Sequence, residues 1–371
     1  MIPLVDLKRL SPEVKRSIGS RINKVIGDSD FILGKEVVLF EKEFANYVGT
    51  KYCIGVNSGT DAIKLGLKAL GISNGDEVIV PATTFFASAS PVIMVGANPV
   101  FVDIDPDTAL INPNKIEQAI TKKTKAIMIV HLYGNSNNLE DIIKIAKKHK
   151  LYIVEDACQA HGSKYRNKTL GSFGDFAAFS FYPGKNLGAY GDAGAITTSN
   201  ANLAEILFLL RNHGAVAGEK YIHKIFGFNS RMDSIQAAVL RIKLNRLNRD
   251  NKIRSSKATL YKKLLSDLNI KIILPAPSIT PNYHLFVIKT SYRNELLAYL
   301  RTKKIFCGIH YPTPLHLEKA LNKFDYKEGD FPYAEKHARE CLSLPIFPEI
   351  TNSEIKFICS QIKNFFKEME D

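Results

Sequence analysis

The first half of the chain alternates short apolar runs with amphipathic helical segments. Runs this short and this hydrophobic are typical of strands buried on both faces of a sheet. They occupy residues 77–80, 99–102, 126–130 and 151–154. Helical stretches such as 139–149 separate them, as the crossover between two parallel strands requires. The pattern predicts an α/β fold built on a mostly parallel sheet.

The alternation changes character after about residue 250. Shorter predicted strands at 271–274 and 284–289 surround a predicted helix at 293–303, which indicates a small α+β unit. A chain of 371 residues exceeds the size at which one hydrophobic core keeps growing. We therefore expect a large domain at 1–250 and a smaller C-terminal domain at 251–371.

Two residues indicate a chemistry for the large domain. Lys185 lies in a loop between predicted strands 175–181 and 194–198, which would hold it on rigid supports. Asp156 lies just after the run 151–154, so we expect it at the carboxyl end of the sheet, where open α/β folds bind ligands. A partly desolvated lysine can form a Schiff base with an aldehyde, and a carboxylate can keep a pyridine nitrogen protonated. The pair is typical of pyridoxal phosphate enzymes, although each residue alone is more often a solvated lysine or a helix cap.

Other segments supply groups that this cofactor needs. Gly59 and Thr60 lie in a small polar turn before a predicted helix, where N–H groups and a hydroxyl could hold a phosphate or form an ordinary N-cap. Ser180 precedes the lysine by five residues and could add a second hydroxyl. Gln159 could hydrogen-bond the phenolic oxygen of the ring, and Phe85 could stack on the ring or pack in the core.

These motifs run in the order found in a known family. The chain resembles the DegT-type nucleotide-sugar aminotransferases, which have the three-layer fold of the aspartate aminotransferase superfamily (fold type I) with a smaller α+β C-terminal domain. The resemblance extends from the N-terminus to beyond residue 310 and so covers nearly the whole chain. It rests on the segments 57–62, 80–85, 102–105, 131–134, 155–162 and 227–233.

The resemblance implies a role for each of these residues. Lys185 would be the Schiff-base lysine, and its retention argues for transamination because relatives with histidine there are dehydratases. Asp156 would pair with the pyridine nitrogen, Gln159 would contact the ring oxygen and Phe85 would stack on the ring. Asn229 is similar to the residue that reaches the phosphate from the neighbouring subunit, which implies a homodimer with two shared sites. The residues expected to hold the phosphate within one subunit are Gly59, Thr60 and Ser180.

The segment after the lysine, 182–195, resembles family members that aminate carbon 3 of a dTDP-linked 3-keto-6-deoxyhexose, with L-glutamate as the donor. The expected product is a dTDP-3-amino-3,6-dideoxyhexose for surface-glycan or O-antigen biosynthesis. Members that act on carbon 4 usually carry a Thr-Gly-Glu-Gly-Gly run here, yet amination at carbon 4 and a UDP-linked 3-keto sugar remain alternatives. Residues expected near the substrate, each of which could instead be a packed aromatic or an exposed cation, are Tyr182, Lys220, His310 and Tyr311.

The net charge of +13, from 50 Lys and Arg against 37 Asp and Glu, has three interpretations. The densest basic segment, 241–263, reads as one long helix, and it could bind nucleic acid. It could also be a solvated helix face, or a basic rim that steers a nucleotide sugar to the site. The sequence lacks a helix-turn-helix, zinc or RNA-recognition signature, so a nucleic-acid-binding regulator is the weaker hypothesis.

Composition narrows the remaining classes. With 45% hydrophobic and 23% charged residues the chain is typical of a folded soluble protein. Its five cysteines are widely spaced and predict neither a metal site nor a disulfide framework. The start shows no basic segment followed by an apolar core, and no apolar run approaches eighteen residues. We therefore expect a cytoplasmic protein without a membrane partner.

Overall fold

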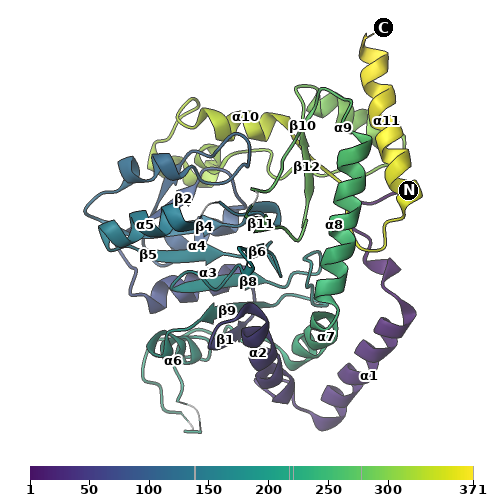
Figure 1. Cartoon of the computed structure of the whole chain (residues 1–371). Coiled ribbons are helices and arrows are strands. Elements are labelled where there is room, and N and C mark those ends of the chain that lie inside the picture. Colours follow the sequence, from purple (N-terminus) through teal and green to yellow (C-terminus); the bar gives the residue numbers. More distant parts are fainter. Residues whose placement is uncertain (138, 217, 220, 277, 371) are drawn as a thin grey trace.

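The computed structural model describes residues 1–137, 139–216, 218–219, 221–276 and 278–370. At its centre lies a seven-stranded sheet in the order β1-β9-β8-β5-β4-β2-β3 (Figure 1). Six of these strands run in one direction, and β9 is antiparallel to both of its neighbours. Two three-stranded sheets accompany it, β10-β12-β13 and β11-β6-β7. The mostly parallel sheet predicted from the sequence is confirmed.

The strands have the following bounds: β1 Tyr52–Val56, β2 Glu77–Pro81, β3 Asn98–Val102, β4 Thr124–Val130, β5 Tyr152–Asp156, β6 Lys164–Tyr165, β7 Lys168–Thr169, β8 Phe176–Ser180, β9 Gly194–Thr198, β10 Lys271–Ile272, β11 Ile279–Thr280, β12 Phe286–Lys289 and β13 Cys341–Leu344.

The helices have the following bounds: α1 Pro12–Asp28, α2 Lys35–Val48, α3 Gly59–Ala69, α4 Ser90–Met94, α5 Leu139–His149, α6 Ala201–Leu210, α7 Ser234–Leu244, α8 Leu247–Leu264, α9 Arg293–Thr302, α10 Pro332–Glu340 and α11 Asn352–Glu370. Over the residues that the structure describes, none of them is long and apolar enough to cross a membrane.

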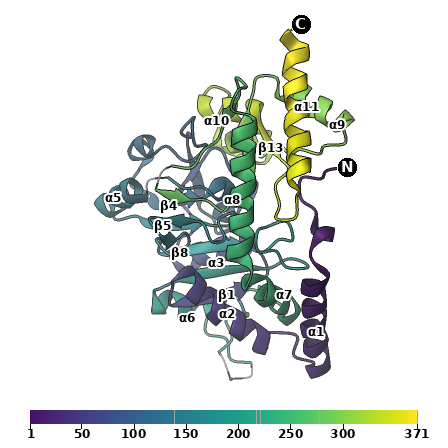
Figure 2. The same ribbon diagram turned by 45° about the vertical axis from the view of Figure 1, so that its right-hand side comes forward.

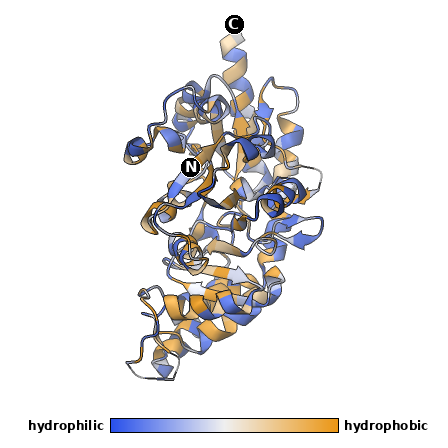
Figure 3. Cartoon of the chain, turned by 90° about the vertical axis from the view of Figure 1, so that its left-hand side faces the viewer, coloured by the Kyte–Doolittle hydropathy of each residue, from blue (hydrophilic) through white to orange (hydrophobic). Residues whose placement is uncertain are grey.

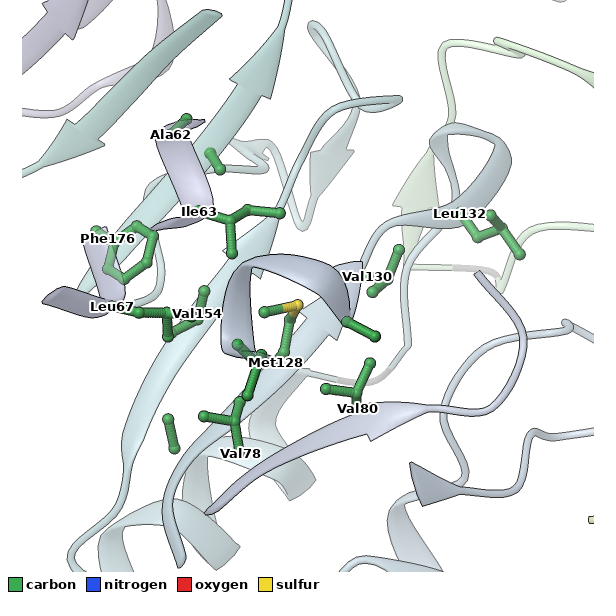
Figure 4. Packing of buried hydrophobic residues seen from close by; sticks show 14 of the residues in the cluster. Ala62, Ile63, Leu67, Val78, Val80, Met128, Val130, Leu132, Val154 and Phe176 are labelled. Atoms are coloured by element: carbon green, nitrogen blue, oxygen red, sulfur yellow. The ribbon is translucent and has the colours of Figure 1, made fainter. Parts of the chain in front are cut away.

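The large sheet is buried on both faces because successive side chains of a strand point to opposite sides. In β4, Met128 packs into the core that contains α3, α4 and α6, whereas Ile127 and Ile129 pack into the core of α2, α5 and α7. Figure 4 shows the first of these cores, in which Ile63 and Leu67 of α3 lie over the central strands. Helices on both sides of one sheet give the three-layer α/β architecture expected from the sequence.

A second, smaller unit forms around β10, β12 and β13. Its core joins α8, α9 and α11 to these strands, with Tyr261, Phe286, Leu300 and Ile358 among its fully buried members. In Figure 2, α8 and α11 run side by side, in agreement with their direct contact. The expected boundary between the two domains, at residues 250 and 251, falls inside α8. The division of the chain into these two domains stays a prediction.

The prediction of one long helix over 241–263 is wrong. The chain forms two helices instead, because α7 ends at Leu244 and α8 begins at Leu247. The two helices belong to different cores: α7 packs against α1 and α2, whereas α8 packs against α11. The chain has to turn between them to reach both cores.

The basic residues of this segment are partly internal, so the solvated-face interpretation is wrong for several of them. Arg241 makes ion pairs with Glu36 and Glu43 of α2. Arg254 is buried and its guanidinium donates to the main-chain oxygens of Tyr283 and Ile346 at 3.3 and 2.8 Å. These cations hold elements of the fold together.

A buried ion pair hydrogen-bonds the backbone of β1, which lies at the edge of the large sheet. The Glu41 carboxylate in α2 accepts a hydrogen bond from the Gly55 N–H at 2.7 Å and pairs with Arg211, the residue after α6. Arg211 also donates to the Gly55 carbonyl at 3.0 Å. Burial raises the pKa of Glu41, and the Arg211 charge opposes that effect. The pair therefore satisfies backbone groups that an edge strand would otherwise expose.

We expect Arg211→Ala to lower the free energy of unfolding by about 3–5 kcal/mol, because it leaves the buried Glu41 carboxylate without its charge partner. Urea unfolding followed by circular dichroism measures this loss. Lys148→Ala is the matched control, because it breaks the exposed pair with Glu117 and should cost less than about 1 kcal/mol. Equal losses in the two variants would contradict the assignment.

Candidate active site

A cavity of about 390 Å³ lies at the carboxyl edge of the large sheet, within the usual size of ligand sites. The strands β1, β2, β4, β5 and β8 share one direction, so the turns that follow them meet at this edge. Ten of the twelve residues predicted from the sequence line the cavity: Gly59, Thr60, Phe85, Asp156, Gln159, Ser180, Tyr182, Lys185, His310 and Tyr311.

Lys185 presents an unpartnered amine to this cavity. Among the residues that the structure describes, none hydrogen-bonds or ion-pairs with its Nζ. Its loop is fixed by main-chain bonds, including Lys185 N–H to the Tyr182 carbonyl at 2.8 Å. Burial lowers the pKa of the Lys185 amine, and the nearby Cys158 and Asp156 only partly oppose that effect. An amine held in this way is prepared to react as a neutral nucleophile or base.

Asp156 is the last residue of β5 and is only 7% exposed. Its Oδ2 accepts a hydrogen bond from the Ser88 hydroxyl at 2.6 Å, and its Oδ1 accepts one from the Cys158 N–H at 3.2 Å. The negative charge of Asp156 raises the pKa values of Cys158, Lys185 and Tyr311. A carboxylate thus lies close to the lysine and faces the same cavity.

Gln159 connects the sheet to a loop that follows α9. Its Oε1 accepts a hydrogen bond from the Tyr133 N–H at 2.6 Å, and its Nε2 donates to the Tyr311 hydroxyl at 3.2 Å. Burial raises the pKa of Tyr311 well above its usual value, so the hydroxyl stays neutral. The Phe85 ring is half-exposed and lies 5.5 Å from the Tyr311 ring, centroid to centroid. Tyr311, predicted as a sugar contact, therefore also supports Gln159.

The first turn of α3 lies against the end of β8. Ser58 caps the helix by accepting the Asp61 N–H at 3.1 Å. A Cβ on Gly59 would approach the Ser180 Cβ to 2.7 Å and the Cys158 Sγ to 2.8 Å, so only glycine fits this contact. The free N–H groups of a helix N-terminus attract anions, and Thr60 and Ser180 border the same end of the cavity.

The remaining predicted residues occupy different places. His310 donates to or accepts from the Ser343 hydroxyl through Nδ1 at 2.8 Å, and burial lowers its pKa to about 4, so its ring is neutral at physiological pH. Tyr182 lies exposed at the rim. Asn229 is exposed and lies outside the cavity of its own chain. Lys220 lies outside the residues that the structure describes.

Several cavity residues had no predicted role. Thr84, Cys158 and Asp192 line the cavity, and Ser88 lies behind it. His131 also lines it and holds the Glu155 carboxylate through Nε2 at 2.9 Å. The polar residues after the end of β2 were a usable signal for Thr84, because the ends of β1, β4, β5 and β8 at this edge also carry cavity residues.

The arrangement fits pyridoxal phosphate. An unpartnered lysine amine could bond the aldehyde carbon, and the buried Asp156 carboxylate could face a protonated ring nitrogen. The glycine-lined start of α3 could take the phosphate. The roles of the individual residues stay predictions, although the cavity brings together the groups that this chemistry needs.

Comparisons with known proteins agree with this reading of the cavity. The model of the DegT/DnrJ/EryC1/StrS aminotransferase family matches residues 12–363. The chain is 44% identical over 369 residues to the dTDP-3-amino-3,6-dideoxy-α-D-galactopyranose transaminase of Aneurinibacillus thermoaerophilus, covering 98% of this chain and 99% of that one. It is 42% identical over 99% of both chains to a pleiotropic regulatory protein of Geobacillus stearothermophilus. The crystal structure of Streptomyces venezuelae DesV in complex with a ketimine intermediate superposes with a TM-score of 0.96, at 42% identity and 98% coverage of each chain.

We expect Lys185→Met to stabilise the protein without cofactor, by about 1–2 kcal/mol near neutral pH. Because burial lowers the pKa of Lys185, the unfolded chain binds more protons than the folded one between that lowered pKa and about 10.4. The stability that this lysine costs therefore grows as the pH falls through that window. Urea unfolding should show a larger gain from Lys185→Met at about pH 7 than at about pH 9.

Lys356→Met on the exposed face of α11 is the control, because an exposed lysine should show no such dependence on pH. A Lys185→Met protein that is less stable than the unchanged chain at both pH values would contradict the proposed burial of the amine.

Proposed function

The chain belongs to the DegT/DnrJ/EryC1/StrS aminotransferase family, and we propose that it transfers an amino group from L-glutamate to carbon 3 of a dTDP-linked 3-keto-6-deoxyhexose. The product would be a dTDP-3-amino-3,6-dideoxyhexose for a surface glycan such as an O-antigen, made in the cytoplasm. The observation that carries the proposal is the unpartnered Lys185 amine facing Asp156 in a cavity of suitable size. The Aneurinibacillus relative, 44% identical over nearly the whole chain, bears the name of a transaminase of this sugar type.

We assign the cofactor as pyridoxal 5′-phosphate, held by the residues that line the cavity. When bound, it supplies an aldehyde that carries the amino group between substrates and a pyridine ring that withdraws electrons from the reacting carbon. Asp156 would hold the pyridine nitrogen, and Gln159 would hold the ring oxygen through its second amide hydrogen. Phe85 would cover the ring. The phosphate would be held by Gly59, Thr60 and Ser180.

Lys185 would carry the proton that each half of the reaction moves. Its lowered pKa leaves a larger neutral fraction of the amine near physiological pH, so it can take a proton from the α-carbon of the amino donor and pass it to the former aldehyde carbon of the cofactor. Because the His310 ring is neutral at physiological pH, it would add no second positive charge near Lys185. In the second half the keto sugar replaces 2-oxoglutarate, and the same amine moves the proton in the reverse direction.

The sugar would lie against the outer wall of the cavity. Tyr182 and His310 border that wall from separate elements and could hydrogen-bond hexose hydroxyls, as could Tyr311 from its place beside Gln159. Lys220 would pair with the diphosphate. A basic protein, with a net charge of +13, would also attract a nucleotide diphosphate sugar over longer distances.

We also propose a homodimer in which each chain completes the site of the other. Asn229 lies on the loop between α6 and α7, outside its own cavity. On the same loop Tyr221 and Phe226 are 91% and 95% exposed, and Ile222 and Ile225 between them in the sequence are exposed as well; apolar side chains gathered at a surface mark interaction sites. Figure 3 shows apolar colour gathered on the helices at the lower end of the molecule, where Figure 1 places α2 and α6. On α6, Ile206 and Phe208 remain more than a third exposed, so this end offers apolar surface to a second copy.

We expect the purified protein with pyridoxal phosphate and L-glutamate to aminate a dTDP-3-keto-6-deoxyhexose, detected as the amino sugar by mass spectrometry. Lys185→Ala should reduce turnover at least about a thousandfold, because it removes the group that carries the proton. Lys356→Ala should leave turnover unchanged.

Competing substrates decide between the alternatives. Amination only of a UDP-linked 3-keto sugar, or only at carbon 4 of a dTDP-linked 4-keto sugar, would refute the assigned substrate while leaving the aminotransferase intact. Sequence-selective DNA binding without any amine transfer would favour the regulator hypothesis, which the name of the Geobacillus relative brings to mind.

We expect Lys185→Ala and Asn229→Ala chains to restore activity when they are unfolded together and refolded as a mixture. Random pairing would give one intact site in each mixed dimer, and so about a quarter of the wild-type sites. Each variant alone should be weakly active or inactive. A mixture no more active than the mean of its two components would contradict shared sites.

A further inference from the structure

We propose that Thr84 and Ser88 form a chain of hydroxyl groups that fixes the ionised carboxylate of Asp156 toward the ring nitrogen of the cofactor, so that both act as positioning residues. The inference rests on the proposed function, since it concerns the carboxylate assigned to the pyridine nitrogen. It is carried by two short hydrogen bonds between buried side chains on separate segments of the chain.

The three side chains form a continuous chain in which Thr84 and Asp156 line the cavity and Ser88 joins them from behind it. The Thr84 and Ser88 hydroxyl oxygens lie 2.8 Å apart, and the Ser88 Oγ lies 2.6 Å from the Asp156 Oδ2. Ser88 is fully buried, Thr84 is 3% exposed and Asp156 is 7% exposed. Water is therefore a poor substitute for either hydroxyl, and removal of one leaves a buried acceptor unpaired.

The chemistry of the groups sets the direction of the chain. An ionised carboxylate can only accept hydrogen bonds, so Ser88 must donate its hydroxyl hydrogen to Asp156. Ser88 then has no hydrogen left for Thr84, and Thr84 must donate to Ser88. The Thr84 oxygen keeps its lone pairs for the cavity that it lines.

The second carboxylate oxygen is held as well. The Asp156 Oδ1 accepts the Cys158 N–H at 3.2 Å, so donors from two segments prevent the carboxylate from rotating. The titratable groups that face Asp156 from other elements are Lys185 and Tyr311, together with the Cys158 thiol. Of these only Lys185 can carry a positive charge, and the groups that donate hydrogen bonds to the carboxylate, the Ser88 hydroxyl and the Cys158 N–H, are neutral.

The turn that carries these hydroxyls also carries Phe85. A 3-10 turn at Phe86–Ser88 is closed by the Ser88 N–H to the Phe85 carbonyl at 2.9 Å. The anchor of Asp156 and the aromatic ring proposed to cover the cofactor thus belong to one rigid segment. The neighbouring Thr83 is equally buried at 3%, yet its hydroxyl has no partner among the described residues. A buried hydroxyl in this turn can therefore lack a hydrogen bond, so burial alone does not explain the bonds of Thr84 and Ser88.

The test measures equilibrium binding of pyridoxal phosphate to protein freed of cofactor. We expect Ser88→Ala to weaken binding about tenfold to a hundredfold, and Thr84→Val about threefold to tenfold. The loss should be larger for Ser88, because Ser88 contacts Asp156 directly whereas Thr84 acts through Ser88.

Thr83→Val is the matched control, because it removes a hydroxyl of equal burial that has no partner, and it should bind like the unchanged protein. Thr84→Ser keeps the hydroxyl and should restore the affinity. Circular dichroism shows whether Ser88→Ala folds; if it does not, Thr84→Val against Thr83→Val decides the question.

Affinities of Ser88→Ala and Thr84→Val that match that of the unchanged protein would overturn the inference while leaving the proposed function in place. Failure of the unchanged protein to bind pyridoxal phosphate at all would instead remove the proposed function, and this inference with it.

Discussion

The parallel pairing of β2, β4, β5 and β8 is the constraint on which the rest of the structure depends. Parallel neighbours carry all their carboxyl ends to one edge, and here that edge receives the turns with Thr84, Asp156 and Ser180. Because both faces of the sheet are buried under helices, the edge is the place where polar side chains can gather without interrupting a core. The antiparallel β9 then begins at the same edge and returns the lysine loop to the sheet.

Local pattern was enough to predict the large sheet and the order of its elements. Strands such as β2, β4 and β9 were found within a few residues, because a run buried on both faces is apolar throughout. The break between α7 and α8 was missed, since the sequence around Asn245 contains no proline or glycine. It follows instead from the need of each helix to reach a different core, which is a property of the whole fold.

The candidate site likewise contains residues that could be predicted from the sequence and residues that could not. Lys185, Asp156 and the Gly59 turn could be predicted because their chemistry is carried by short motifs next to strand ends. Ser88 could not, because its role comes from a 2.6 Å contact with a residue 68 positions away. The Tyr311–Gln159 hydrogen bond joins residues that are 152 positions apart in the sequence, and neither residue type indicates which partner it will have. Asn229 shows a further limit, since it lies outside the cavity of its own chain and its predicted role depends on the proposed dimer.

The cavity is assembled from two sources, and that origin has an evolutionary consequence. The floor comes from the strand ends of the large sheet, whereas the wall with His310 and Tyr311 comes from a loop that follows α9 and precedes α10. On the proposed function, variants of this fold would change their sugar through substitutions in that loop, while the strand ends keep the residues proposed to hold the cofactor.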